Sequence, residues 1–424
     1  MAVVAPNASH HHTALGIKGS GLTQAQLARP LVAIRQSGFE DGNEITTETD
    51  EGHTGVSNLD MGSYRTKAES SPNWEDGLRY GQGFEDYFYL LLAHDDVDNY
   101  ESNDDVYEHV MSMPPDTDDE LPFATIYHGF SKTATDGRVF NNAMLNELEV
   151  TFSADNKPSI KPSFVSDYNI VNTINPSRNF LEDHLSRTVM APHTQVYIGE
   201  IGATEIWDGT GSKEGYMVPI DCFTEASFTI NNNAESQACH DDKFGENTKL
   251  MGEREVTGSI SMPWHDATKY FETEYEAYEK YGHIVSENIT QKQVWYRASG
   301  GNITRTSESD TLATGETLIR EFDDNGTTKY VIGTGIPYQF LAQFPVVEPT
   351  NVTSTKSGNE AKDLTFEWKG IEQSTQSYMT AKFVTDLSAC HIDAVGQART
   401  AVYPPLKDGS NNNINQEFAP YANQ

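Results

Sequence analysis

The sequence predicts a mainly β protein made of β-sandwich-like units, each with one flanking α-helix. Three observations predict this class: short stretches that alternate apolar and polar residues, turn-forming Gly, Asn, Asp and Pro between them, and only two segments with helical periodicity. The chain of 424 residues exceeds the usual length of one domain. Hydrophobic residues make up only 37% of it, which indicates a large exposed area and long polar loops.

Four alternating stretches predict strands with one buried face and one polar face. Their apolar positions are Leu148, Val150 and Phe152; Thr224, Ala226, Phe228 and Ile230; Val256, Ile260 and Met262; and Leu364, Phe366 and Trp368. The residues between these positions are polar or charged, with one glycine among them. Each strand is therefore expected to pack one face on a core and to present the other face to water.

Two segments have the periodicity of amphipathic helices. The first is predicted from Gly83 to His94 and should pack one apolar stripe on a sheet, formed by Phe84, Tyr87, Phe88 and Leu91. The second begins after Pro263, has Asp266 as N-cap and ends near Gly282. Its other face is rich in Glu and Lys, so we expect it to lie on a surface.

The two predicted helices have matching contexts, which indicates an internal duplication. Each follows an alternating strand and a Pro–Trp element, at Gly62–Ser71 with Pro72–Trp74 and at Glu253–Met262 with Pro263–Trp264. We expect a flexible N-terminal arm over 1–30, a first unit over 31–190, a second unit over 191–395 with an insertion around 290–345, and a C-terminal tail over 396–424.

Two segments do not fit a compact unit. The stretch His94–Glu120 is crowded with Asp and Glu, and we expect a solvated loop there. The stretch Asn302–Thr328 is rich in Thr, Ser, Gly and Asp and contains the turn signal Asp323–Gly326, so we expect a hairpin insertion. Such a hairpin would decorate the exterior or contact another copy of the chain.

The charge of the chain argues against a grip on nucleic acid. Lys and Arg number 29 against 63 Asp and Glu, a formal charge of −34, whereas sequence-independent binding needs cations against phosphates. The same charge would keep DNA from adhering to a channel wall. The aromatic residues of the first helix, such as Phe84 and Phe88, are therefore expected to pack in the core and not to stack on bases.

No motif predicts catalysis or a cofactor. The sequence has no G-x-S-x-G elbow, Walker A loop, H-E-x-x-H motif or dinucleotide fingerprint, so we predict no catalytic residue, no cofactor and no enzymatic activity. The tract His10–His12 is expected to be a polar arm rather than a metal site. The run Asp95–Asp98 opens like a calcium loop, but Tyr100 stands where a ligand belongs; a charged loop or a loosely held Ca²⁺ remain the alternatives.

The cysteines and the N-terminal residues indicate the cellular compartment in which the protein is expected. Cys222, Cys239 and Cys390 are too scattered for a disulfide framework or a zinc site, so we interpret them as buried or idle thiols. No signal peptide is visible, and the apolar run Tyr87–Ala93 is far too short to cross a bilayer. We expect a soluble protein that is made in a host cytoplasm and has no membrane partner.

The order of these segments resembles the two-domain tail-tube (major tail) proteins of siphophages. In the first unit the resemblance rests on Ile34–Gly38, the strand Gly62–Ser71, Tyr87–Leu92 and the strand pair Phe123–Tyr127 and Phe140–Phe152. In the second unit it rests on Ala226–Asn233 followed by Glu255–Ile260. The acidic segment His94–Glu120 and the insertion Asn302–Thr328 depart from the pattern of the family.

The resemblance implies a duplicated tube fold of half-barrel domains and a mechanical function. Copies would form rings, expected to be homotrimers with pseudo-sixfold symmetry, that stack into a hollow tube in the virion tail. The implied partners are further copies of the chain, the tape-measure protein, tail tip and terminator proteins, and genomic DNA that passes through without specific binding. The resemblance also suggests that deleting Ala2–Leu27 weakens stacking without unfolding the units.

Two rival functions remain. A virion-displayed or secreted β-sandwich adhesin would be a discrete particle with a shallow aromatic pocket. A polysaccharide-degrading tail enzyme would need a convergent pair of carboxylates in a cleft.

Overall fold

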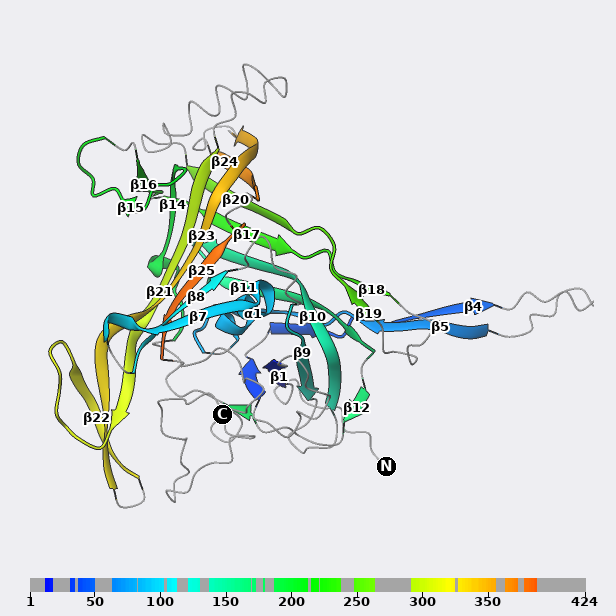
Figure 1. Cartoon of the computed structure of the whole chain (residues 1–424), viewed down its shortest axis with the longest axis horizontal. Helices are drawn as coiled ribbons and strands as arrows, with labels where there is room; N and C mark the ends of the chain where they lie inside the picture. Colours follow the sequence, from blue (N-terminus) through cyan, green and yellow to red (C-terminus); the bar gives the residue numbers. More distant parts are fainter. Residues whose placement is uncertain are drawn as a thin grey trace, which may run out of the picture.

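The computed structural model of the chain is mainly β, with one α-helix in the part that it describes (Figure 1). The predicted fold class is confirmed. The structure describes residues 12–17, 31–34, 37–49, 63–81, 83–102, 105–112, 121–129, 137–168, 170–172, 178–179, 187–212, 215–220, 222–237, 248–263, 291–324, 327–355, 363–372 and 377–386. The second predicted helix, Cys239 and Cys390 lie outside these residues.

Eight strands form one continuous antiparallel sheet, which we call the main sheet. In spatial order they are β3 (Ser37–Glu40), β6 (Asn73–Gly77), β11 (Ser159–Asp167), β10 (Gly137–Ser153), β17 (Glu225–Asn231), β20 (Glu255–Pro263), β24 (Asp363–Gly370) and β23 (Thr327–Thr355). The four strands predicted from alternation lie in β10, β17, β20 and β24, and all four are confirmed.

The two longest strands of the main sheet, β10 and β23, continue beyond it and pair with further strands. Beside the first half of β10 lie β9 (Ala124–Gly129) and β12 (Ile170–Asn172), and β9 leads to β1 (His12–Ile17), β2 (Leu31–Ile34) and β13 (Arg178–Asn179). Beside the first part of β23 lie β21 (Lys292–Ser307), β22 (Thr317–Asp324) and β25 (Thr380–Thr385). Next to β21 follow β14 (Thr194–Glu200), β16 (Tyr216–Pro219) and β15 (Glu205–Ile206). Next to β25 follow β8 (Tyr107–Ser112) and β7 (His94–Asn99).

Two hairpins leave the main sheet on the same side (Figure 1). They are β4 (Glu44–Thr49) with β5 (Ser63–Ser70), and β18 (Glu235–Gln237) with β19 (Thr248–Leu250). Their bases match, because Ser71 N–H donates to Gly42 O at 3.1 Å and Gly252 N–H donates to Asn233 O at 3.1 Å. Gly42 and Asn233 both have positive φ, 54° and 47°.

The strand order of the main sheet repeats. The first four strands, β3-β6-β11-β10, have the same connections and neighbours as the last four, β17-β20-β24-β23, and the two hairpins occupy equivalent places. We call these groups the first and second repeat, and we count the elements that lie between or directly after their strands in the sequence as part of the same repeat. The repeat agrees with the duplication that the sequence predicts. The two repeats meet edge to edge where β10 pairs with β17.

The helix α1 (Phe84–Leu92) lies on the apolar face of the main sheet, where Trp74 Nε1–H donates to Tyr87 Oη at 3.1 Å. The predicted helix and its packing on a sheet are confirmed, and Glu85 and Asp86 are buried as well. The ring of Phe88 lies 5.1 Å from that of Phe340 and 5.5 Å from that of Phe383, both in the second repeat. The helix therefore packs across both repeats.

A buried ion pair also joins the repeats. Arg187, in the segment between them, donates to the carboxylate of Asp386 just after β25, and both side chains are fully buried. The guanidinium lies 5.1 Å from the ring centroid of Tyr338, which in turn stacks on Tyr80 at 5.1 Å. We call this group the Arg187 clamp. It connects the segment between the repeats to the end of β25, and through Tyr80 it contacts the first repeat.

Two sequence expectations are wrong. The proposed flexible arm contains β1, whose Leu15 and Ile17 belong to the hydrophobic core, so the deletion Ala2–Leu27 would remove a core strand. The stretch from His94 is not a loop throughout, because β7 and β8 form a hairpin joined by a 3-10 turn (Tyr100–Ser102), and Met111 on it is fully buried. Another 3-10 turn (Ala191–His193) precedes β14.

Candidate functional site

One face of the main sheet is polar along all of its strands, and we call it the polar face. Successive residues of a strand point to alternate faces of the sheet. Val150, Phe228 and Phe366 are buried on one face, so the residues next to them in sequence belong to the polar face. Among the side chains that the structure describes, its charged residues are eight glutamates and two lysines: Glu40, Glu75, Glu147, Glu149, Glu225, Glu255, Glu348 and Glu367 with Lys161 and Lys369. The formal charge is therefore −6.

Between the carboxylates the polar face carries neutral hydrogen-bonding groups. Asn231 Nδ2–H donates to Glu147 Oε2 at 2.9 Å, and Asn351 Nδ2–H donates to Glu367 Oε2 at 3.1 Å. Lys369 Nζ lies 3.5 Å from Glu255 Oε1, with both side chains about half exposed, and Lys161 stands opposite Glu149. An exposed pair of this kind neutralises little of the surrounding field. The polar face repels phosphate and offers water many partners.

The opposite face of the sheet is covered. Its residues form one hydrophobic cluster with α1 and with the strands that continue from β10 and β23, and the cluster includes Trp74, Phe164, Phe228, Ile260 and Trp368. Burying such side chains contributes about 1.5–3 kcal/mol each. Among the described residues, a second layer covers this face and not the polar face.

Arg254 fixes the hairpin base of β18 and β19 to the helix. Its Nε–H donates to Asn232 Oδ1 at 2.8 Å and its Nη2–H donates to Leu91 O at 3.0 Å. Burial lowers the pKa of the Arg254 guanidinium to about 10, so it remains charged at neutral pH. This contact holds the second repeat against the end of α1.

The strand pairing between the repeats, which we call the internal seam, is a regular antiparallel ladder. It runs from Glu147 opposite Asn231 to Ser153 opposite Glu225. At its two ends Asn232 N–H donates to Asn146 O at 2.7 Å and Ala154 N–H donates to Thr224 O at 3.0 Å. Main-chain hydrogen bonds thereby join the two four-stranded repeats along one edge, and the Asn231–Glu147 side-chain hydrogen bond adds to them.

The main sheet ends at two strands that each have an edge with no partner strand among the described residues. β3 pairs with β6 and with no other described strand. β23 pairs with β21 only as far as Val347, so its last residues, 348–355, contact β24 on one side only. Glu40 and Thr353 on these edges are exposed. Unpaired edges of this kind are templates for another strand.

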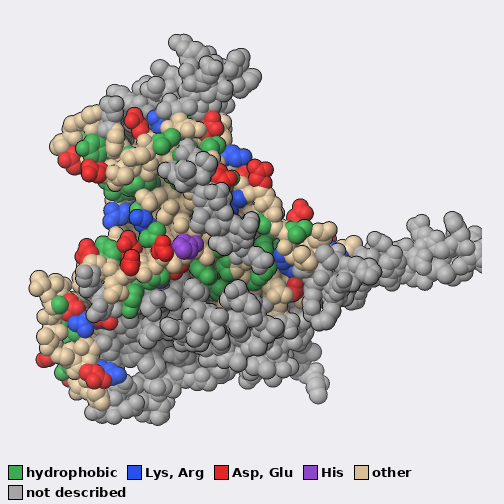
Figure 2. Space-filling model, in the orientation of Figure 1, with side chains coloured by type: hydrophobic (Ala, Val, Ile, Leu, Met, Phe, Trp, Pro, Cys, Tyr) green, Lys and Arg blue, Asp and Glu red, His purple; other side chains and the backbone are tan. Residues whose placement is uncertain are grey.

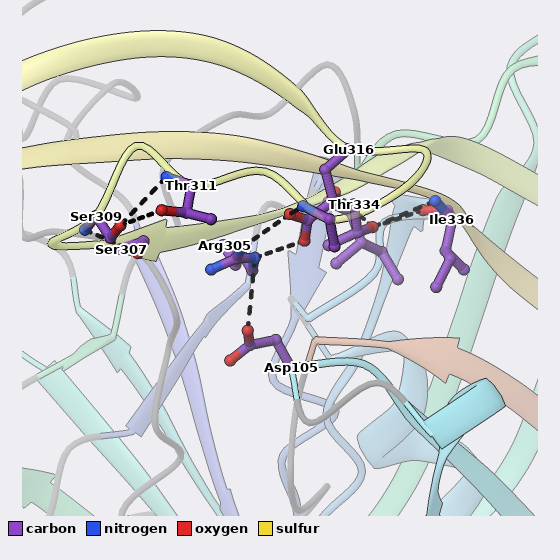
Figure 3. Close-up of polar contacts among 10 residues, drawn as sticks. Asp105, Arg305, Ser307, Ser309, Thr311, Glu316, Thr334 and Ile336 are labelled. Carbon is purple, nitrogen blue, oxygen red and sulfur yellow. Dashed lines mark hydrogen bonds and ion pairs between the residues drawn. The ribbon is translucent and has the colours of Figure 1, made fainter.

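The insertion after β21 forms a projecting hairpin, as the sequence predicts in outline (Figure 3). At its base Arg305 donates from Nε and Nη2 to both oxygens of Glu316 at 2.8 Å, and Asp105 lies 3.7 Å from Arg305 Nε (Figure 3). These hydrogen bonds lower the pKa of Glu316 and raise that of Arg305. Leu318 and Ile319 on the hairpin are about half exposed, so the insertion adds exterior surface and little core.

The residues considered for metal binding do not form a site in the described part of the chain. Asp95 is buried in β7, where its Oδ2 lies 2.8 Å from His109 Nδ1, so this carboxylate is already paired. No group of three His, Cys, Asp or Glu side chains able to hold a metal is present among the described residues. His12 begins β1, whereas His10 and His11 lie outside the described residues.

The helix aromatics, Cys222 and a possible membrane span are the other features that the sequence raised. Phe84, Tyr87 and Phe88 are buried in the core, which confirms their packing role. Cys222 is exposed rather than buried. Across the described residues, no helix has the length and apolar character needed to cross a membrane. Acidic side chains are spread over the visible surface, with few basic ones between them (Figure 2).

The polar face was not identified from the sequence, although its signal was present. Glu147, Glu149, Glu225, Glu255 and Glu367 all alternate with the apolar positions of the predicted strands. Alternation alone shows that each strand has a wet side. It does not show that four distant strands place those sides on one surface, because that depends on strand order.

A comparison with protein families agrees with this architecture. The profile of the family described as Phage tail tube protein matches residues 38–370, more than three quarters of the chain. The match begins in β3 and ends at the last residue of β24, so it includes both repeats of the main sheet. A comparison with curated proteins finds no match. The family match confirms the resemblance seen in the sequence: the chain belongs to the phage tail tube protein family.

Proposed function

We propose that copies of this chain form rings that stack into a hollow tube, and that the tube conducts genomic DNA toward the host. As a member of the phage tail tube family, the chain is a structural protein of the virion tail. The ring, its symmetry and the passage of DNA are the proposal. The expected homotrimer would place six repeats around one axis, because each copy carries two.

The internal seam is the observation that carries the proposal. One repeat already joins the next by strand pairing between β10 and β17, and the outer edges of β3 and β23 are the corresponding edges at the two ends of the chain. Joining identical copies through these edges is a head-to-tail contact, which closes into a ring when its rotation divides a full turn. Three copies of eight strands would make a barrel of 24 strands.

The polar face supplies the wall of the channel. Because α1 and the second layer cover the other face, closing the sheet with that face inward would fill the interior with core side chains. Closing it the other way lines the interior with glutamates, at a formal charge of −6 for each copy. Such a wall repels the phosphates of DNA and releases no counterions to bind it.

Further features of the tail belong to the same proposal. They include the division into units over 31–190 and 191–395, synthesis in the host cytoplasm and siphophage origin. They also include contacts with a tape-measure protein and with tail tip and terminator proteins. The tape-measure protein would occupy the channel before DNA does. The hollow tube that we propose would provide the channel and the ends at which these partners bind.

Electron microscopy of the purified chain at rising concentration tests the proposal. Hollow tubes or stacked rings with a channel of duplex-DNA width are the expected result. Discrete particles that do not stack, even with a tail-tip initiator complex added, would contradict it.

A second experiment tests the wall. Assembled tubes that carry Glu149→Lys and Glu225→Lys are expected to retain DNA fragments at low salt, whereas unsubstituted tubes do not, because each lysine adds a cation to the channel. The control exchanges Glu321, an exposed residue of the projecting hairpin, for Lys. Equal retention by the control and the wall variant would contradict the placement of the polar face inside the tube.

A further inference from the structure

We propose that the seam between neighbouring copies pairs β3 of one copy with the end of β23 of the next, in the register that places Glu40 opposite Thr355. The partner is a second copy of this chain. The inference rests on the proposed ring and goes beyond it, because it specifies which edges meet and which residues face each other. The register follows from transferring the internal seam along the repeat.

The first step relates β10 to β23. In β10 the three-residue step from Phe140 to Ala143 lies opposite a two-residue step of β9, from Ile126 to Ala124. In β23 the same irregularity occurs, with the step from Phe344 to Val347 opposite Val294 to Lys292 of β21. The equivalent residues of β10 and β23 at this bulge therefore differ by 204 in number.

The residue spacing from each long strand to the strand that follows it gives the same offset independently. Thr151 lies opposite Ser159 in the β10–β11 pair, and Thr355 lies opposite Asp363 in the β23–β24 pair. Both differences are again 204. Because the bulge and this spacing agree, no insertion separates them in either repeat, and Thr355 occupies the position of Thr151.

The second step relates β3 to β17. Ser159 and Ser163 of β11 face Gly77 and Asn73 of β6. The equivalent residues of β24, Asp363 and Glu367, face Pro263 and Ser259 of β20, so β6 and β20 differ by 186 at both points. Asn73 therefore corresponds to Ser259. Since Asn73 faces Glu40 of β3 and Ser259 faces Ser227 of β17, Glu40 occupies the position of Ser227.

The third step transfers the seam. Ser227 faces Thr151 across the internal seam, so Glu40 of one copy faces Thr355 of the next. The backbone hydrogen bonds at both ends of the internal seam involve even-numbered residues of β10, Asn146 and Ala154. Thr151 therefore stands at a non-hydrogen-bonded pair, where Cα atoms approach to about 4.5 Å. The same short Cα–Cα distance is therefore expected between Glu40 of one copy and Thr355 of the next.

Both strands are able to make this contact. Among the described strands, none pairs with the outer edge of β3 or with β23 beyond Val347 on that side. Glu40 is exposed and lies on the polar face, and the backbone of Thr355 occupies the strand position equivalent to Thr151. The seam would continue the polar face without interruption from one copy to the next.

A disulfide experiment tests the register, because a disulfide forms only when the Cα atoms lie within about 7 Å. The full chain, with Cys222, Cys239 and Cys390 replaced by Ser, receives Glu40→Cys and Thr355→Cys. Assembled rings are oxidised gently and analysed on a non-reducing gel. Each crosslink should join two chains, so we expect dimers and then a covalently closed ring, and only in assembled material.

Two control pairs calibrate the result. The pair Thr151→Cys with Ser227→Cys crosslinks within one chain across the internal seam and shows that the chemistry works at this kind of position. The pair Glu40→Cys with Thr353→Cys is two residues out of register and should crosslink roughly tenfold more slowly, because diagonal neighbours lie farther apart.

The outcomes separate this inference from the proposed function. Rings that form but yield no dimer, or that crosslink faster through position 353, overturn the register while leaving the ring intact. Absence of rings from the unsubstituted chain overturns both. If the cysteine pair hinders assembly, the strand pairing at Glu40 is read from cryo-electron microscopy of unsubstituted tubes, where any other residue opposite Thr355 contradicts the inference.

Discussion

The two repeats agree within the main sheet and differ outside it. Their bulges and strand spacings match at a constant offset of 204 residues between β10 and β23. The first repeat, however, supplies α1 and the β7–β8 hairpin, which pack on or pair with strands of the second repeat. The second repeat carries the projecting hairpin of β22 and β23.

This difference teaches which parts of the chain assemble the wall and which parts hold the chain together. A sheet that continues from copy to copy needs the same edges in every repeat, so the main sheet tolerates little divergence. The connections across the internal seam are under no such constraint. They have been reinforced by α1, by the β8–β25 pairing and by the Arg187 clamp. The predictions below separate these two kinds of element.

The largest effect is expected at the Arg187 clamp. Arg187→Ala leaves the Asp386 carboxylate buried without its cation, which should lower the free energy of unfolding by roughly 3–5 kcal/mol. Urea denaturation measures the change. The matched control is Arg138→Ala, which breaks the partly exposed pair with Asp41 at 3.3 Å and should cost at most about 1 kcal/mol. Equal losses in the two variants would show that the clamp does not hold the repeats together.

A smaller effect is expected within the main sheet at Gly258. A Cβ added there would lie 2.2 Å from Cζ2 of Trp368, whose ring is buried and cannot move aside. Gly258→Ala should therefore cost about 1–3 kcal/mol through overpacking. The neighbouring Ser259→Ala on the polar face should change stability by no more than about 0.5 kcal/mol. Thermal melts of both variants check this, and a neutral Gly258→Ala would contradict the packing described.

The projecting hairpin should respond to pH through Glu316. Arg305 lowers the folded-state pKa of this carboxyl, so its stabilising contribution is complete above the ordinary value of about 4.3 and is lost as the pH falls through the lowered value. The contribution should be at most about 1 kcal/mol. The stability difference between the unsubstituted chain and Glu316→Gln, followed by denaturation at several pH values, should be present at pH 7 and vanish in acid. A difference that grows in acid would have the wrong sign.

The smallest effect is expected on the exterior of the hairpin. Ile319 is 55% exposed, so Ile319→Ser should change stability by no more than about 0.5 kcal/mol and leave ring formation intact. Sedimentation of the assembled variant provides the measurement. Loss of rings would move the hairpin from decoration to a contact between copies.

Much of the main sheet was predictable from local pattern. Leu148, Val150 and Phe152 alternate with polar residues, and Phe84 and Phe88 have helical spacing, so β10 and α1 were found from the sequence. β1 was missed because Leu15 and Ile17 stand beside a Gly-rich stretch that is typical of an arm. β7 was missed because its exposed side carries Asp96 and Asp98, which suggest a loop.

The site was predictable only in parts. The polar positions of each strand follow from alternation, but the pairing of β10 with β17 joins residues about 80 apart, and local pattern does not specify which strands pair. The buried partners Asp95 with His109 and Arg187 with Asp386 are charged residues that pattern assigns to the surface. Long-range pairing, not local propensity, decides where such groups lie.

The mass of a single ring tests the central claim that one chain supplies two sectors of the tube. Native mass spectrometry of rings, isolated before they stack, measures it. With 47.1 kDa for each chain, the account predicts three copies, about 141 kDa. A ring of six copies, about 283 kDa, would show that each chain supplies one sector and would contradict the account.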